Sequence, residues 1–393
     1  MKSKFQNIEI GKLVCKIITC DPKVFKQTPT FHYVDISSIN RVTKQIETTN
    51  QILLNEAPSR ARQIINYGDI LVSTVRPNLN AVAQVPINLN DEIASTGFTV
   101  LRPDASKLDS RFLFHWVKNS QFVSYLEKNA AGASYPAVTD KIVKAGKIPL
   151  PPLPEQKRIA EVLDSADALR EKRRLALRKL DSLLQSVFLE MFGDPVRNPK
   201  GWEVKRFDEL GKLERGKSKH RPRNAPELLG GKYPLIQTGE VANAKGYIKS
   251  FTQTYSEIGL KQSRMWKAGT LCITIAANIA KTAILTFDAC FPDSIVGFIA
   301  NESVKTEYVQ HWLSFRQKEI EEKAPESAQK NINLKILSEL DVPLPPIELQ
   351  NKFAEIVKKI EALKAEKQKS AEKIENLFQS LQQRAFKGEL FTL

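Results

Sequence analysis

The sequence predicts an α+β protein in which two globular domains are joined by a long antiparallel two-helix coiled coil, with a pseudo-twofold internal repeat. A stretch of 44 residues occurs twice, at 149–192 and at 343–386, and the two copies are identical at 14 positions without a gap. Short β-type runs followed by a helix precede each copy, which is the pattern of a mixed α+β domain. A repeat of this length is the feature that the rest of the chain must fit.

Each copy predicts one long helix, because prolines precede it and an uninterrupted run of good helix formers follows. Apolar residues recur at alternating spacings of four and three, a heptad seam that requires a partner helix. Arg173 and Lys367 interrupt the seam at matching positions and could fix the register of the pair. The alternative is two amphipathic helices that each lie on their own domain. The predicted seam comprises Val162, Ala166, Leu169, Ala176, Leu180, Leu183 and Val187, then Ile356, Ile360, Leu363, Ser370, Ile374, Leu377 and Leu381.

The direction of pairing follows from distance. About 38 residues of helix extend over ~57 Å, whereas the ~140-residue segment between the copies has a radius of gyration near ~14 Å. Parallel helices would require that segment to carry the chain back along the whole pair, so we expect antiparallel helices.

Composition indicates the kind of partner. The 393 residues carry a formal net charge of +15, and the pI is about 9.5, which favours a polyanionic ligand. The four cysteines lack the C-x-x-C spacing of a zinc site, and we expect no bound metal. The start of the chain has no apolar signal core, and the longest apolar run, 270–287, indicates two strands and a turn. We therefore expect a cytoplasmic protein.

The order of segments is a first domain at 1–148, a first long helix at 149–192 and a linker at 193–200. A second domain follows at 201–342, then a second long helix at 343–387 and a tail at 388–393. The first domain is expected to contain one helix from about residue 109 to 128. The second domain repeats the first loosely, since His311-Trp312 stands where His115-Trp116 stood.

In this arrangement, with PLPPLPEQ at 149–156 and PLPPIELQ at 343–350, the chain resembles the specificity subunit of a type I restriction–modification enzyme. The second copy keeps only Gln350 of the Glu-Gln pair that ends the first. The resemblance implies that 1–148 and 201–342 are target-recognition domains, each reading half of a split DNA site. It also implies that the helices set the spacing, bind two methyltransferase subunits and are joined by motor–nuclease subunits. S-adenosylmethionine, ATP and Mg²⁺ are expected only in those partners.

The residues themselves indicate no catalytic site. The adenine methyltransferase signature, a G-x-G cofactor turn, H-E-x-x-H and G-x-S-x-G do not occur. Residues 211–218 match the P-loop pattern, but a charged segment precedes them and Pro222 and Pro226 oppose the helix that should follow. We therefore expect a non-catalytic DNA-recognition subunit. The alternatives are a coiled-coil adaptor that binds protein or RNA, and an enzyme with an unrecognised site.

Candidate DNA contacts are cationic and amide side chains in predicted turns, because these side chains bind phosphates and base edges. A solvated loop is the alternative in each case. The basic run 170–179 could contact phosphates and is equally consistent with a solvated face of the long helix. The candidates are Lys217, Lys219, His220, Arg221 and Arg223 in the second domain, Arg60, Arg62, Arg76, Asn78 and Asn80 in the first, and Ser134, Tyr135, Gln329, Lys330 and Asn331 in the segments before the long helices.

Overall fold

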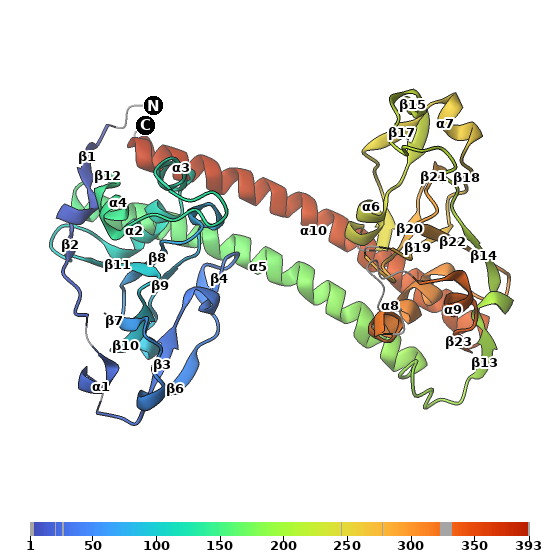
Figure 1. Ribbon diagram of the computed structural model, residues 1–393, viewed down its shortest axis with the longest axis horizontal. Helices are drawn as coiled ribbons and strands as arrows, with labels where there is room; N and C mark the ends of the chain where they lie inside the picture. Colours follow the sequence, from blue (N-terminus) through green and yellow to red (C-terminus); the bar gives the residue numbers. More distant parts are fainter. Residues whose placement is uncertain are drawn as a thin grey trace. The chain divides into compact units, whose positions relative to one another are not determined.

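The computed structural model describes residues 4–19, 21–25, 27–244, 246–276, 278–322 and 332–391. The chain divides into two compact units, of which the first comprises Met1–Leu175 with Gln368–Leu393 and the second comprises Ala176–Lys367. Each unit contains part of two long helices, α5 (Leu153–Phe192) and α10 (Ile347–Lys387). The first unit holds the beginning of α5 and the end of α10, and the second holds the end of α5 and the beginning of α10. Each unit therefore combines one globular domain with segments of both helices (Figure 1).

The domain of the first unit contains two four-stranded sheets, with strand orders β6-β3-β10-β7 and β2-β11-β8-β9. All neighbours are antiparallel except the pair β3 and β10. A separate hairpin of β4 and β5 projects a turn at residues 41–44. The strands are β1 (Gln6–Glu9), β2 (Val14–Cys15), β3 (Thr30–Val34), β4 (Ile39–Asn40), β5 (Gln45–Ile46), β6 (Asn50–Leu53), β7 (Ala61–Ile65), β8 (Ile70–Ser73), β9 (Val82–Gln84), β10 (Glu92–Ser95), β11 (Phe98–Pro103) and β12 (Lys147–Leu150).

Where one helix was predicted over 109–128, the structure has two, α2 (Ser110–Val117) and α3 (Ser120–Lys128). Asn119 ends the first and caps the second, because its side chain accepts a hydrogen bond from the Gln121 amide at 2.8 Å. Asparagine competes for backbone groups in this way and favours a cap over a helix interior. Two short helices, α1 (Pro22–Phe25) and α4 (Asp140–Ala145), complete the domain.

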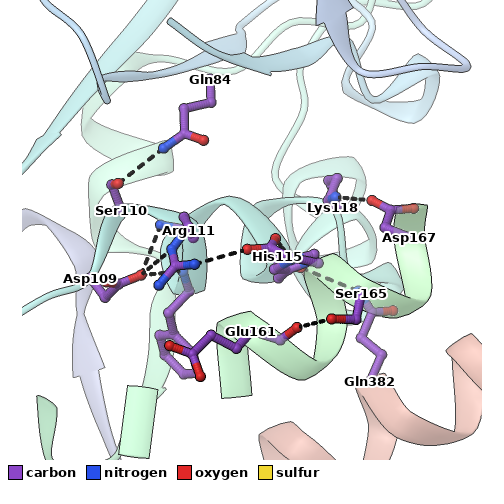
Figure 2. A network of polar contacts seen from close by, with 12 residues as sticks. Gln84, Asp109, Ser110, Arg111, His115, Lys118, Glu161, Ser165, Asp167 and Gln382 are labelled. Atoms are coloured by element: carbon purple, nitrogen blue, oxygen red, sulfur yellow. Dashed lines mark hydrogen bonds and ion pairs between the residues drawn. The ribbon is translucent and has the colours of Figure 1, made fainter. Parts of the chain in front are cut away.

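The first domain packs onto the beginning of α5 and the end of α10. Ile159 and Leu163 of α5 share a buried cluster with Phe112 of α2 and with Phe378 and Phe386 of α10. Polar contacts also join α2 and its C-terminal end to α5 (Figure 2): His115 Nε2 lies 2.7 Å from Asp164, and Lys118 Nζ lies 2.7 Å from Asp167. The beginning of one helix thus lies beside the end of the other. The helices are antiparallel, as predicted.

The second unit repeats this architecture. Its sheets have the orders β17-β15-β21-β18 and β14-β22-β19-β20-β16, and β15 and β21 form a parallel pair as β3 and β10 do in the first unit. The run 270–287 forms two strands and a turn, as predicted. The strands are β13 (Glu203–Arg206), β14 (Gly211–Arg215), β15 (Leu229–Leu235), β16 (Gly246–Ile248), β17 (Gln253–Tyr255), β18 (Met265–Trp266), β19 (Leu271–Thr274), β20 (Thr282–Leu285), β21 (Ala289–Cys290), β22 (Ile295–Ala300) and β23 (Asp341–Leu344).

The helices of the second domain are α6 (Thr238–Asn243), α7 (Glu257–Lys261), α8 (Thr306–Glu322) and α9 (Leu334–Ser338). Here the end of α5 meets the beginning of α10. Phe188 and Phe192 of α5 lie 5.5 and 5.3 Å, centroid to centroid, from Phe353 of α10. Both also contact Tyr308 of α8. The antiparallel order of the helix pair is therefore the same in this unit.

The first strand of each domain pairs with the strand that leads into a long helix. β1 pairs antiparallel with β12, and β13 pairs antiparallel with β23. Each domain is therefore closed by its own ends before the helix begins. The prolines after β12 and β23 set that point, because they cannot extend the helix backwards.

The predicted seam is wrong at four leucines. Leu169, Leu183, Leu363 and Leu377 are 51%, 46%, 45% and 53% exposed. The other predicted apolar members are buried or half-buried. Sequence reasoning failed at these leucines because it treated only helix–helix packing, whereas the buried face also has to meet a globular domain. Charged pairs occupy part of that face: Arg170 with Glu375 in the first unit, and Lys364 with Asp181 in the second.

Candidate nucleic-acid interface

The turn that follows β8 in the first unit holds strained backbone. Arg76 and Asn80 adopt left-handed conformations, with φ of 49° and 44°, on either side of the 3₁₀ turn Pro77–Leu79. A residue before proline disfavours helical conformations, and non-glycine residues at positive φ are uncommon. Such strain persists only where the surroundings enforce it, and it concentrates at functional sites. The turn therefore marks a candidate site.

The surroundings that enforce this turn come from the loop at residues 131–137. The Arg76 amide donates to the Pro136 carbonyl at 2.7 Å, and the Val138 amide donates to the Thr74 carbonyl at 2.8 Å. Gly132 adopts φ of 102°, and a Cβ there would lie 2.9 Å from the Tyr135 carbonyl oxygen. The Arg76 guanidinium stacks over the Tyr135 ring, 4.5 Å from its centroid. The structure thus brings together two predicted contacts, Arg76 and Tyr135.

The β4–β5 hairpin lies beside the same turn. Lys44 Nζ donates to the Asn80 carbonyl at 2.5 Å, and Lys44 itself has φ of 58°. Burial, together with the nearby charges of Lys118 and Arg41, lowers the pKa of Lys44 to about 8. Arg41 is exposed at the tip of the hairpin. Lys118 pairs with Asp167, whereas Arg41, Lys44 and Arg76 form no ion pair with another described residue. Cations without such partners favour an anionic ligand.

A cavity of about 160 Å³ opens between these groups, and Arg41, Arg76 and Tyr135 stand at its edge. We call this cavity, together with Arg41, Lys44, Arg76 and Tyr135, the Arg76 site. Sequence reasoning missed Arg41 and Lys44, although both stand in a polar turn, NRVTKQ, that could have been noted for its cations. Their proximity to Arg76 depends on how the hairpin packs, which no local pattern shows.

In the second unit the predicted basic loop, residues 215–223, follows strand β14. Gln262 holds its backbone, since its Oε1 accepts hydrogen bonds from the amides of Lys219 at 2.7 Å and His220 at 3.1 Å. Lys217 and Lys219 are exposed. Asp293 pairs with Arg221 at 3.5 Å and with Arg223 at 2.6 Å. The two lysines are therefore better placed for phosphates than the two arginines.

The remaining candidates are distributed as follows. Asn78 and Ser134 are exposed within the two segments of the Arg76 site, while the Asn80 side chain donates to the Lys118 carbonyl. Arg60 and Arg62 belong to a different sheet, at and before β7, and Arg62 pairs with Asp21 at 3.2 Å. Gln329, Lys330 and Asn331 lie outside the described residues.

The two domains differ at the Arg76 turn. The matching turn of the second unit, between β19 and β20, keeps the left-handed position at Ala280, with φ of 56°. It also keeps the hydrogen bond that Val138 donates to Thr74 in the first unit, because the Ile332 amide donates to the Ile275 carbonyl at 3.0 Å. Its described residues carry no arginine. The two domains therefore share a frame and present different side chains on it.

The described residues provide little support for catalysis by this chain. Gly211–Arg215 is strand β14, and residues 216–225 form no helix, so the P-loop match lacks its required context. His115 is buried against Asp164. Within the described ranges, no three His, Cys, Asp or Glu side chains gather as they would around a metal ion. None of the helices in those ranges is long and apolar enough to span a membrane.

The fold and the two basic sites define a class of protein: a duplicated DNA-binding scaffold built on a helix pair. The family model described as the type I restriction modification DNA specificity domain matches residues 3–178 and 199–376. The chain belongs to this family. It recognises DNA sequence and assembles with other subunits of a restriction–modification system, and catalysis in such systems lies in those other subunits.

Individual relatives agree. The MjaVIII type I restriction enzyme specificity subunit of Methanocaldococcus jannaschii is 25% identical over 341 residues, which cover 79% of this chain and 76% of that protein. A solved chain from work on complex assembly and conformational transition of the type I R-M system has a TM-score of 0.60 at 26% identity, covering 99% and 100% of the two chains. The S subunit of M. genitalium, at 15% identity and a TM-score of 0.60, covers 98% and 96% and supports the fold.

Proposed function

We propose that the chain is the subunit of a type I restriction–modification complex that reads a bipartite DNA site, with one half read by each domain. One observation carries this proposal: the framework is duplicated, whereas the basic side chains are not. Among the described residues of the second unit, no arginine stands in the turn that matches the Arg76 turn, and the loop at 215–223 supplies cations elsewhere. Identical domains would read identical half-sites, so different side chains on one frame favour two different half-sites.

Exposed leucines on the helices support two copies of a single partner. The first unit exposes Leu169 of α5 and Leu377 of α10, and the second exposes Leu183 of α5 and Leu363 of α10. The repeat relates Leu169 to Leu363 and Leu183 to Leu377, each pair being 194 residues apart. Each unit thus presents the same pair of leucines. Exposed apolar side chains that recur in this way favour an interaction surface, and equal surfaces bind equal partners.

We assign these two surfaces to two methyltransferase subunits, with motor–nuclease subunits joining them for cleavage. S-adenosylmethionine, ATP and Mg²⁺ then belong to those subunits. α5 and α10 each run without interruption through both units, which supports a role for the helices in fixing the spacing of the two half-sites.

The test is selection of duplex DNA from a random library by the full chain with its methyltransferase. We expect a split site with a fixed spacer. Changing Arg76 to alanine should relax the first half-site alone, and changing Lys217 and Lys219 to alanine should weaken contacts at the second half alone. Exposed Lys16 changed to alanine is the control. Binding that shows no sequence preference, or that is equally strong for RNA, would contradict the proposal and favour an adaptor.

A further inference from the structure

The cavity of the Arg76 site has an aliphatic floor, whereas arginine and tyrosine side chains stand at its edge. Ile36, Val75, Leu79 and Ala81 line it with aliphatic groups. Ala81 is buried, and the other three side chains are half-buried, so the floor is accessible from outside. At a surface that carries Arg41, Lys44 and Arg76, this small apolar recess is out of keeping with phosphate binding alone.

Hydrogen bonds tie together the segments that form the recess. Hydrogen bonds from Arg76 and Val138 fix the turn against the loop at 131–137, and Ala131 and Ala137 form a bridge within that loop. Lys44 ties the hairpin to the turn through the Asn80 carbonyl. A preformed recess costs little ordering on binding and can therefore discriminate between ligands that differ by one small group.

Duplex DNA presents one exposed apolar group in the major groove, the C5-methyl of thymine. A phosphate would leave the aliphatic floor unfilled, and an apolar protein segment would leave three cations unpaired. A thymine within a duplex satisfies both features, since its methyl group fits an aliphatic recess while flanking phosphates and base edges meet the arginines.

We propose that the Arg76 site receives the C5-methyl group of a thymine, so that the half-site read by the first domain contains a thymine at one defined position. This inference rests on the proposed function and adds to it a base and the residues that recognise it. Leu79 and Val75 contact the methyl group, and Arg76, held over Tyr135, contacts the adjacent DNA.

The experiment measures the affinity of the full chain with its methyltransferase for duplexes that carry the selected site. Each thymine of the first half-site is replaced in turn by deoxyuridine, which lacks only the methyl group, and by 5-bromodeoxyuridine, whose bromine has a similar size. We expect one position at which deoxyuridine weakens binding by roughly fourfold, the value of burying one methyl group. The bromo analogue should restore binding there.

Variants assign the effect to this recess. In Leu79→Ala and in the isosteric Val75→Thr, thymine and deoxyuridine at that position should bind within about a factor of two of each other. The control is Leu53→Ala, which removes an exposed aliphatic side chain of β6 elsewhere in the first unit. It should keep the full difference.

The outcomes separate the two proposals. If the split site is bound but no thymine of the first half responds to loss of its methyl group, the methyl recess is wrong and the bipartite reading stands. A response that persists unchanged in both recess variants also overturns the assignment. If no split site is selected at all, the proposed function itself fails.

Discussion

Gln156 and Gln350 make the same three hydrogen bonds in their respective units. Gln156 Oε1 accepts from the Asp109 amide, and its Nε2 donates to the carbonyls of Lys107 and Pro151, each at 2.9 Å. Gln350 Oε1 accepts from the Lys305 amide at 2.9 Å, and its Nε2 donates to the carbonyls of Ser303 and Pro345 at 3.3 and 2.8 Å. Both are fully buried. Each glutamine ties the first turn of a long helix to the start of α2 or α8.

Replacing Gln156 by leucine should strongly destabilise the first unit. The change removes a buried hydrogen bond to the Pro151 carbonyl and half-buried ones to the Lys107 carbonyl and the Asp109 amide. A buried polar group left without a partner costs about 1–3 kcal/mol, and a half-buried one costs less. We expect the free energy of unfolding to fall by about 2–5 kcal/mol in urea denaturation, and Gln350→Leu should act similarly on the second unit. Gln121→Leu, at an exposed position of α3, is the control. A loss below 1 kcal/mol would show that the tie is dispensable.

Stability should fall as the pH drops below about 6.5. Burial lowers the pKa of His115, with Asp164 acting in the opposite direction, and burial likewise lowers the pKa of His311. Between its folded and unfolded pKa values, a buried histidine binds more protons when unfolded, so acid favours unfolding. A neutral His115 that donates from Nε2 to Asp164 also fits the absence of a hydrogen-bond partner at its buried Nδ1.

The measurement is urea unfolding between pH 5 and pH 7.5. His115→Gln and His311→Gln should each flatten the dependence. Stability that does not vary with pH in this window would mean that both histidines keep their ordinary pKa.

The exposed leucines predict the stoichiometry of partner binding. Leu169→Glu combined with Leu377→Glu places charges on the helix surface of the first unit only. We expect native mass spectrometry to show one methyltransferase subunit per chain instead of two. Val24→Glu, at a position that is 82% exposed on α1, should retain two. Two bound subunits in the double variant would place the partner elsewhere.

The helix pair predicts the length of the DNA spacer. Deleting 171–177 and 365–371 removes one heptad at matching positions and retains the ion pairs of Arg170 with Glu375 and of Lys364 with Asp181. Each helix shortens by roughly 10 Å, or about three base pairs at 3.4 Å per step. Library selection with fixed half-sites should therefore return a shorter spacer or weaker binding.

Rotation complicates that outcome. Three base pairs turn the DNA by roughly 100°, whereas one heptad of supercoil turns by only about 25°. A compromise spacer is therefore compatible with the spacing role. Recovery of the parental spacer at parental affinity would show that the helices do not set the distance.

The sequence alone determined the duplicated organisation, because a repeat of 44 residues and the prolines at its start can be read directly along the chain. Prolines at the start of each copy predicted where the helices begin, and the comparison of helix length with domain size predicted that the helices are antiparallel. The predicted turn around Arg76 and the segment before the first long helix also indicated Arg76 and Tyr135 as candidates, and the structure brings these two residues together.

Only the tertiary structure decided which helix face is buried and which cations meet. Leu169 and Leu377 fit a heptad seam, yet both are exposed. The domain packs against Ile159 and Leu163 instead, so the helix face that carries these two residues is the buried one. Arg41 and Lys44 lie beside the turn that holds Arg76 only because a hairpin packs against a turn more than 30 residues later. Helical periodicity specifies spacing along one element, whereas the orientation of that element depends on the free energy of packing against everything else it contacts.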